Sequence, residues 1–255
     1  MPEHSSAHQH SNAHQHSCEH SPNTEPHSHH SHEHGPHNNA SQPDASADPA
    51  KFWEKRYGGQ DRVWSGRVNA TLADVASQWS PGRSLDLGCG EGGDVIWLAE
   101  RGWQATGIDI SATATVRATA AARERGATSA RFIAADLAHW IEDPARIDSS
   151  EHGFDLVTAS FLQSPVALPR ERILRAAAAR VAAGGRLVVV AHAEPPAWAK
   201  GHGGDFPVPE EDLAALELDA RAWEIEACET RERATTAPDG TASTLLDSLV
   251  IVRRR

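Results

Sequence analysis

Residues 85–94 read LDLGCGEGGD, and this stretch decides the fold of the chain. Before it, Arg83 to Leu87 has the length of a buried strand, and after it Val95 to Glu100 is expected to open a helix. The four glycines between them permit positive φ angles and let a ligand approach the backbone. The first amides of the helix lack intrahelical partners and point outward. Together these features predict a nucleotide-sized cradle at the carboxyl end of a sheet.

The rest of the body predicts strands and helices in alternation. Strands are expected over 83–87, 104–109, 131–135, 154–159, 186–192, 222–233 and 243–253, and helices over 50–57, 68–79, 111–126, 169–181 and 210–216. Ser111 is the expected N-cap of its helix. Strands separated by helices indicate a mostly parallel α/β sheet with right-handed crossovers. Pro238-Asp239-Gly240 predicts a hairpin between the last two strands, so an antiparallel pair should close the sheet.

The first fifty residues differ in composition from the rest of the 255. They hold 12 of the 16 histidines, six acidic residues and no Lys or Arg. Such a segment cannot bury enough apolar surface to offset the entropy lost on ordering, so residues 1–49 are predicted to be a disordered His-rich tail and linker. Residues 50–255 are long enough for one α/β domain with a full core.

Charge and cysteine content narrow the class of protein. The formal net charge is −11, of which −6 comes from the tail (no basic and six acidic residues) and −5 from the body. An acidic body without a basic stripe argues against nucleic acid or an anionic membrane as the partner. Cys18, Cys89 and Cys228 are widely separated, as in a reducing compartment. No signal-peptide pattern or long apolar run is present, so a cytoplasmic protein is expected.

Paired histidines recur in the tail. The first units are His8/His10 and His14/His16. Flexible pairs of imidazoles suit Ni, Cu and Zn, so the tail is predicted to bind transition-metal ions weakly. The alternative is a solvated low-complexity leader with no dedicated ion. No metal site is predicted in the domain.

The glycine turn leaves two nucleotide classes open. Gly88, Gly90 and Gly93 satisfy G-x-G-x-x-G with Asp109 about twenty residues further on, which is the fingerprint of a dinucleotide site. Asp86, however, comes two residues before the first glycine, where a carboxylate suits a ligand amine better than a pyrophosphate. Asp136 follows the third strand, where it could contact an adenine amino group.

Residues 83–193 resemble a class I S-adenosylmethionine-dependent methyltransferase. Four motifs occur in the family's order: LDLGCGEGGD (85–94), TGIDIS (106–111), FIAADL (132–137) and FDLVTASFLQSP (154–165). The resemblance implies a Rossmann-like, doubly wound sheet of seven strands with an antiparallel last strand. It also implies S-adenosyl-L-methionine as the cofactor.

The resemblance assigns roles to the strand ends. Gly88 and Gly90 would let the backbone approach the methionyl portion, Asp86 would face its amino group, and Asp109 would hold both ribose hydroxyls. Asp136 and Leu137 would flank the adenine, and Cys89, Ile110 and Ser160 complete the expected cofactor contacts. Each acid has a structural alternative: a turn or helix-dipole acid for Asp86, an Asx turn for Asp109 and an N-cap for Asp136.

The segment WEKRYGGQDRVWSGRVN (53–69) resembles the leader of small-molecule methyltransferases of the tellurite-resistance and thiopurine type. In those enzymes the leader folds over the cofactor as a lid. The resemblance makes Trp53, Arg56, Trp64 and Ser65 candidate cleft residues. The alternative is ordinary docking of an N-terminal helix.

The fourth strand ends in SFLQSP (160–165), without the Asp/Asn-Pro-Pro-aromatic run that resembling enzymes use on base or glutamine amino groups. This favours a small-molecule acceptor. The reaction needs alignment and exclusion of water rather than a metal or a triad. A soft acceptor such as a thiol or a metalloid oxyanion needs the least help from a base.

Four side chains are weighed for roles in the acceptor pocket or as reacting groups. His192 is a weak candidate for a general base and His202 a weaker one. Trp198 is a candidate for the acceptor pocket, and Cys89 is expected to pack rather than react. Two other functions stay open: a metal-binding or metal-sensing protein that merely holds S-adenosylmethionine, and an NAD(P)-dependent oxidoreductase.

Overall fold

A computed structural model describes residues 47–148, 150, 152–199 and 206–255. Most of the predicted tail, with His8, His10, His14 and His16, lies outside these residues, as does His202. The expected division into a tail (1–49) and a domain (50–255) therefore stays a prediction.

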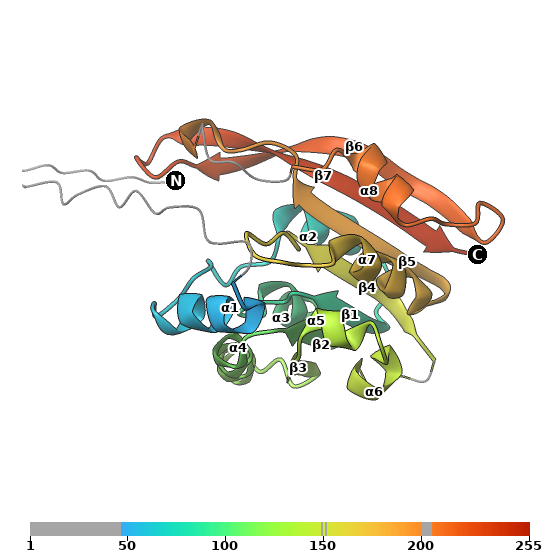
Figure 1. Cartoon of the computed structure of the whole chain (residues 1–255), viewed down its shortest axis with the longest axis horizontal. Coiled ribbons are helices and arrows are strands. Elements are labelled where there is room, and N and C mark those ends of the chain that lie inside the picture. The colour runs from blue at the N-terminus through green and yellow to red at the C-terminus, as the bar shows by residue number, and fades with distance from the viewer. Residues whose placement is uncertain (1–46, 149, 151, 200–205) are drawn as a thin grey trace, which may run out of the picture. The chain divides into compact units, whose positions relative to one another are not determined.

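The described residues form a sheet of seven strands in the order β3-β2-β1-β4-β5-β7-β6 (Figure 1). The strands are β1 Arg83–Leu87, β2 Gln104–Asp109, β3 Ala130–Ala134, β4 Phe154–Ser160, β5 Val181–His192, β6 Trp223–Thr236 and β7 Ala242–Arg254. The neighbours among β1 to β5 run parallel, whereas β7 runs antiparallel to both β5 and β6. This confirms the expected doubly wound sheet with a reversed last strand.

In the part of the chain that the structure describes, two helices precede the first strand, and helices lie in the connections from β1 through to β6. They are α1 Pro49–Gly58, α2 Ala70–Ala76, α3 Gly93–Glu100, α4 Ala112–Glu124, α5 Leu137–Trp140, α6 Pro144–Asp148, α7 Arg170–Ala179 and α8 Pro209–Ala215, with a short 3₁₀ turn, η1, at Ala197–Ala199. Ser111 caps α4 as predicted, because its hydroxyl accepts a hydrogen bond from the Ala114 amide at 3.1 Å.

The main differences from the sequence-based expectation are two element starts and two missed helices. The helix predicted over 68–79 is α2, which begins later because the Asn69 side chain accepts from the Leu72 amide and caps it there. The strand predicted from residue 186 begins at Val181, which pairs with Phe154, so the residues expected to turn lie within β5. Helices α5 and α6 were missed because four and five residues are too few to show a periodic pattern.

Two hydrophobic cores lie on opposite faces of the sheet. Alternate residues of a strand point to opposite faces, so Leu187 and Val189 of β5 join one core and Val188 and Val190 the other. The first core includes residues of α5 and α7, and the second includes residues of α2, α3 and α4. Helices therefore cover both faces, and the carboxyl ends of the parallel strands are left to form a site.

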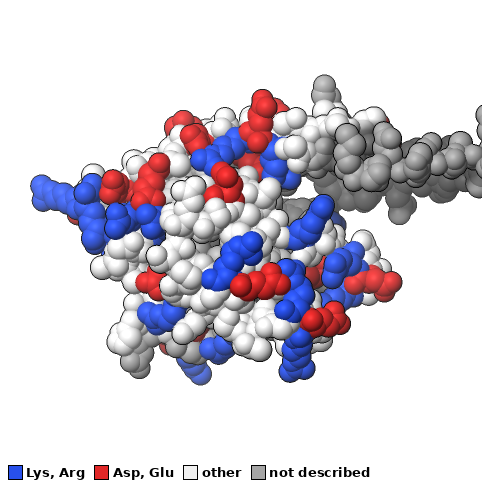
Figure 2. Space-filling view, turned by 180° about the vertical axis from the view of Figure 1, so that it is seen from behind, with Lys and Arg blue, Asp and Glu red and all other residues white. Residues whose placement is uncertain are grey.

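The surface carries mixed charge on the face that Figure 2 shows. Basic and acidic side chains are interspersed there, with neither sign forming a continuous field. Within the described ranges, no helix has both the length and the apolar character needed to cross a bilayer.

Candidate functional site

Two adjoining cavities open at the carboxyl ends of β1, β2 and β4. Their volumes are about 980 Å³ and about 130 Å³. Trp64, Gly88 and Phe161 line both cavities. The glycine turn, the segment between α1 and α2 and the end of β6 line the larger one, whereas α1, α5 and the loop after β4 line the smaller one.

The residues predicted to bind the cofactor are divided between these cavities. The larger is lined by Asp86, Gly88, Cys89, Gly90 and Ser160. The smaller is lined by Gly88, Asp109, Ile110, Asp136 and Leu137. Trp64 stands where the cavities meet. The larger cavity thus brings together residues that are up to 96 positions apart among those predicted to bind the cofactor (Trp64 to Ser160).

The glycine turn is tied closely to the neighbouring strand. The amides of Gly88 and Cys89 both donate to the Ile108 carbonyl, at 2.8 and 3.0 Å. Gly90 has a φ of 52°, and a Cβ added there would lie 2.9 Å from the Tyr57 hydroxyl. Only glycine suits both that backbone conformation and that close approach.

Asp109 ends β2 and orients the turn. Its carboxylate accepts from the Gly90 amide and the Ser111 amide, each at 2.9 Å. Burial raises the pKa of Asp109. The bond from Ser111 is the Asx turn considered above, and it coexists with a place in the cavity wall. Because an ionised carboxylate accepts about four hydrogen bonds, Asp109 keeps capacity for ligand hydroxyls.

Asp86 and Asp94 form an acidic pair in the larger cavity. The Thr158 hydroxyl donates to Asp86 at 2.7 Å, and the Asn69 amide donates to Asp94 at 2.6 Å. Burial, together with the charge of Asp94, raises the pKa of Asp86 well above its ordinary value, and burial raises the pKa of Asp94. A cation bound between them would favour the ionised form of both, so the pair suits a positively charged ligand group.

Ser160 adds an unpaired hydroxyl to this wall. Its buried Oγ has no hydrogen-bond partner among the described residues, although it lies close enough to Asp94 to lower the pKa of that carboxyl. Buried polar atoms normally have partners, so this hydroxyl suits a polar ligand.

Asp136 caps a helix and also lines a cavity. Its side chain accepts from the Ala138 amide at 2.8 Å and caps α5, which confirms the N-cap alternative. It also lines the smaller cavity beside Leu137 and Ile110. A carboxylate against apolar walls provides both the polar and the stacking contacts that a purine requires.

The segment before β1 covers the cleft. Trp53 lines the smaller cavity, and its indole nitrogen donates to the Ser164 hydroxyl at 3.3 Å, while Ser65 lines the larger one. Arg56 does not line either cavity; its guanidinium lies 5.8 Å from the ring centre of Trp64. Burial and the charge of Asp109 raise the pKa of Tyr57, so the phenol stays protonated.

Two of the side chains weighed for acceptor chemistry, His192 and Trp198, do not lie in the cavity walls. His192 lies behind Phe161, with the two rings stacked 4.2 Å apart, and its Nδ1 is 3.6 Å from Asp247. Trp198 is exposed in η1 and is absent from both linings. Cys89 lines the larger cavity, but burial raises the pKa of its thiol well above the ordinary value, which favours packing over nucleophilic attack.

Other residues of the site were missed. Phe161, with a φ of 54°, follows β4 directly and carries the same strand-end signal as Ser160. Arg233 reaches the larger cavity from β6, with its guanidinium 5.4 Å from the Phe161 ring centre. No local pattern marks Arg233. Where the structure describes side chains, His, Cys, Asp and Glu form no group of three suited to a metal ion.

Comparison with known proteins finds similarity to methyltransferases over part of the chain. The family model described as a methyltransferase domain matches residues 85–185, from β1 into β5. A 2-heptyl-1-hydroxyquinolin-4(1H)-one methyltransferase of Mycobacteroides abscessus is 32% identical over 145 residues, which are 57% of this chain and 60% of that protein. A ribosomal RNA small subunit methyltransferase C of Chromohalobacter salexigens is 34% identical over 145 residues, 55% of this chain and 40% of that protein. The chain spans less than two thirds of the length of these relatives.

Solved structures share the fold. TehB from Haemophilus influenzae aligns with a TM-score of 0.56 and 16% identity over 79% of this chain and 67% of that one. The N-methyltransferase NodS from Bradyrhizobium japonicum WM9, solved with S-adenosylhomocysteine, aligns with a TM-score of 0.56 and 19% identity over 81% of this chain and 99% of that one. Residues 85–185 therefore match the model of a methyltransferase domain, and the described residues share the fold of these two solved structures.

Proposed function

We propose that this protein transfers a methyl group from S-adenosylmethionine to a small-molecule acceptor. One observation carries the proposal: carboxylates from successive strand ends, Asp86, Asp109 and Asp136, line two adjoining cavities around a glycine turn. Their surroundings match the chemistry of the parts of this cofactor. When bound, the cofactor supplies a methyl group on a sulfonium, which the acceptor takes by in-line displacement.

Each part of the cofactor has a matching set of residues. Asp86, with Asp94 beside it, holds the amino group of the methionyl portion. Asp109 accepts from the ribose hydroxyls while keeping its bonds from Gly90 and Ser111. Asp136 faces the adenine amino group, and Leu137 and Ile110 form the apolar wall.

The part of the larger cavity beyond the glycine turn receives the acceptor. Arg67 and Arg233 line this space, together with Thr235 and Thr236, which suits an acceptor that carries negative charge. We take that acceptor to be a thiol or a metalloid oxyanion, because such groups are nucleophilic near neutral pH without a strong base. The relative that acts on a hydroxyquinolone supports an acceptor of small size. Trp64 and Tyr57 exclude water, and the remaining task is alignment.

Calorimetric titration tests the cofactor assignment. The full chain is expected to bind S-adenosylhomocysteine saturably at one site and to give no heat with NADH at the same concentrations. Saturable NADH binding without S-adenosylhomocysteine binding would favour the oxidoreductase and overturn the proposal. Turnover on a panel of thiols, tellurite, selenite and a hydroxyquinolone then identifies the acceptor, and binding without turnover on any of them would favour a sensor.

Trp64→Ala tests whether the leader contacts the cofactor. The indole is 49% exposed although it lies between the cavities, so removing it costs little packing. We expect the dissociation constant for S-adenosylhomocysteine to rise by about tenfold, the value of one aromatic contact, with a nearly unchanged thermal midpoint. A fall in the midpoint with unchanged affinity would instead identify Trp64 as a packing residue.

A further inference from the structure

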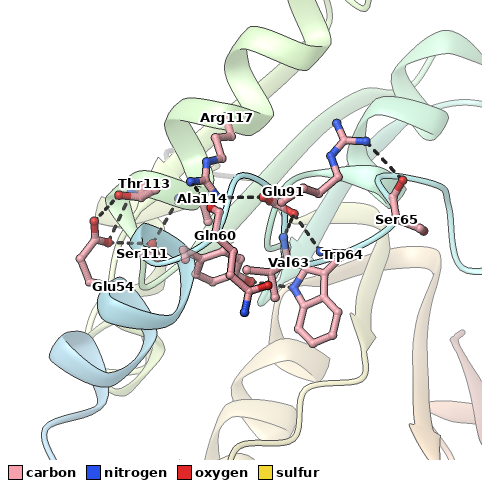
Figure 3. A network of polar contacts seen from close by, with 12 residues as sticks. Glu54, Gln60, Val63, Trp64, Ser65, Glu91, Ser111, Thr113, Ala114 and Arg117 are labelled. Carbon is pink, nitrogen blue, oxygen red and sulfur yellow. Dashed lines mark hydrogen bonds and ion pairs between the residues drawn. The ribbon is translucent and has the colours of Figure 1, made fainter. Parts of the chain in front are cut away.

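The leader is fastened to the glycine turn by Glu91. Its Oε2 accepts from the backbone amides of Val63 and Trp64, at 3.1 and 3.0 Å (Figure 3). The side chain is 5% exposed and belongs to the same turn as Gly90. A cofactor in the cleft would therefore lie against a turn that itself holds the leader.

Arg117 completes this fastening from α4. Its guanidinium donates to the second oxygen of Glu91 at 3.1 Å and to the Gln60 carbonyl at 2.7 Å. Figure 3 shows the carboxylate between the arginine and the two leader amides. Hydrogen bonds to a buried ionised group are stronger than neutral ones. Loss of Arg117 would leave the Glu91 carboxylate without its cation. Loss of Glu91 would leave the guanidinium and the two leader amides without this acceptor.

The clamped segment carries the indole that separates the two cavities. The Trp64 indole nitrogen donates to the Tyr57 hydroxyl at 2.9 Å, so both the backbone and the ring of this residue are held. Half of the residue is nevertheless exposed, and it faces both cavities. A large apolar ring that is held in place and has an exposed face is suited to cover a bound ligand.

Glycines flank the clamped segment, and helix α1 before it has an anchor of its own. Gly58 and Gly59 precede it, and Gly66, with a φ of 68°, follows the tryptophan. Helix α1 is held elsewhere, by hydrogen bonds from the Ser111 hydroxyl and from Thr113 to Glu54 (Figure 3). The loop can therefore open without release of α1.

We propose that Glu91 and Arg117 are positioning residues that latch Trp64 over the bound cofactor and set how fast it leaves. This role rests on the proposed function, because it requires S-adenosylmethionine in the cleft. Opening the latch breaks the hydrogen bonds that the Val63 and Trp64 amides donate to Glu91 and the hydrogen bond that Arg117 donates to the Gln60 carbonyl. The ion pair with Arg117 holds the Glu91 carboxylate in place for these amides. The two residues act through Trp64 and do not take part in the chemical step.

The dissociation rate of S-adenosylhomocysteine from the full chain, followed by stopped-flow tryptophan fluorescence, tests this role. Glu91→Ala is expected to raise the rate by at least about tenfold, since bonds to a charged group are lost. Arg117→Gln should act in the same direction. Glu91→Gln keeps one acceptor oxygen for the amides and should fall between Glu91→Ala and the wild type. Hydrogen exchange should quicken at the amides of Val63 and Trp64 in Glu91→Ala.

Glu100→Gln is the matched control. It removes a Glu–Arg pair between the last residue of α3 and the C-cap of α4, Arg125, at 2.7 Å and outside both cavity linings, and should leave the rate unchanged. Wild-type dissociation rates in both Glu91→Ala and Arg117→Gln would overturn the latch, even with normal binding by the wild type. If Glu91→Ala does not fold, Glu91→Gln and Arg117→Gln decide the matter. If the wild type binds no S-adenosylhomocysteine, the proposed function fails and this role fails with it.

Discussion

Asp109→Ala is expected to weaken S-adenosylhomocysteine binding by about 100-fold or more. A strand-end carboxylate that accepts from two ribose hydroxyls contributes two charge-assisted bonds of about 1.5–3 kcal/mol each, and about 3 kcal/mol corresponds to roughly 100-fold in affinity. Calorimetric titration of the full chain measures the change. The same substitution leaves the Gly90 and Ser111 amides without their acceptor, so unfolding must be measured as well.

Asp109→Asn separates binding from stability. The asparagine amide keeps one acceptor oxygen for the backbone amides, and the carboxylate that it replaces has a pKa raised by burial. We therefore expect a small change in stability together with most of the affinity loss predicted for Asp109→Ala. Asp155→Asn is the matched control, because Asp155 also accepts a backbone amide, from Arg83 at 2.7 Å, but at the amino end of β4. Wild-type affinity in Asp109→Asn would show that the carboxylate orients the turn without contacting the cofactor.

Local sequence patterns predicted the central sheet well. The bounds of β1 and β2 are those expected, because clear turn or capping residues stand on both sides of each strand. The early start of β5 could not be predicted in this way. Residues Ala182-Ala183-Gly184-Gly185 have turn composition, and only pairing of Val181 with Phe154 across the sheet makes them part of a strand.

The residues of the candidate site also fall into those that local patterns predict and those that they do not. Strand-end acids were predictable, because the carboxyl ends of parallel strands meet at one edge of the sheet. Glu91 lay in the quoted motif, yet its partners are 26 to 28 residues away, on the leader and on α4. Arg233 and Asp247 reach the cleft region only through the antiparallel ending of the sheet. Such contacts depend on tertiary distance, which no spacing rule in a single sequence supplies.

Asp247→Ala is expected to destabilise the protein by about 3–5 kcal/mol, the usual cost of breaking a buried ion pair. Asp247 on β7 is fully buried and accepts from Arg233 at 2.6 and 3.2 Å and from the Thr71 hydroxyl at 3.1 Å. It therefore joins β6, β7 and α2 behind the larger cavity. Denaturant unfolding measures the loss. Glu226→Gln removes a pair with Arg186 on the same sheet whose side chains are 23% and 25% exposed, and it should cost about 1 kcal/mol or less.

The pH dependence distinguishes this ion pair from simple packing. Burial acts to raise the pKa of Asp247, but the nearby His192 ring, the hydrogen bonds from Arg233 and the charge of Arg233 outweigh it and hold the pKa below its ordinary value. A carboxyl with a lowered folded-state pKa stabilises the protein above its unfolded pKa of about 3.9. That contribution is lost as the pH falls through the folded value. The stability difference between wild type and Asp247→Ala should therefore narrow on acidification from about pH 5 to pH 3. A difference that stayed constant over that range would show that Asp247 contributes volume rather than charge, and would leave Arg233 without an electrostatic anchor at the acceptor wall.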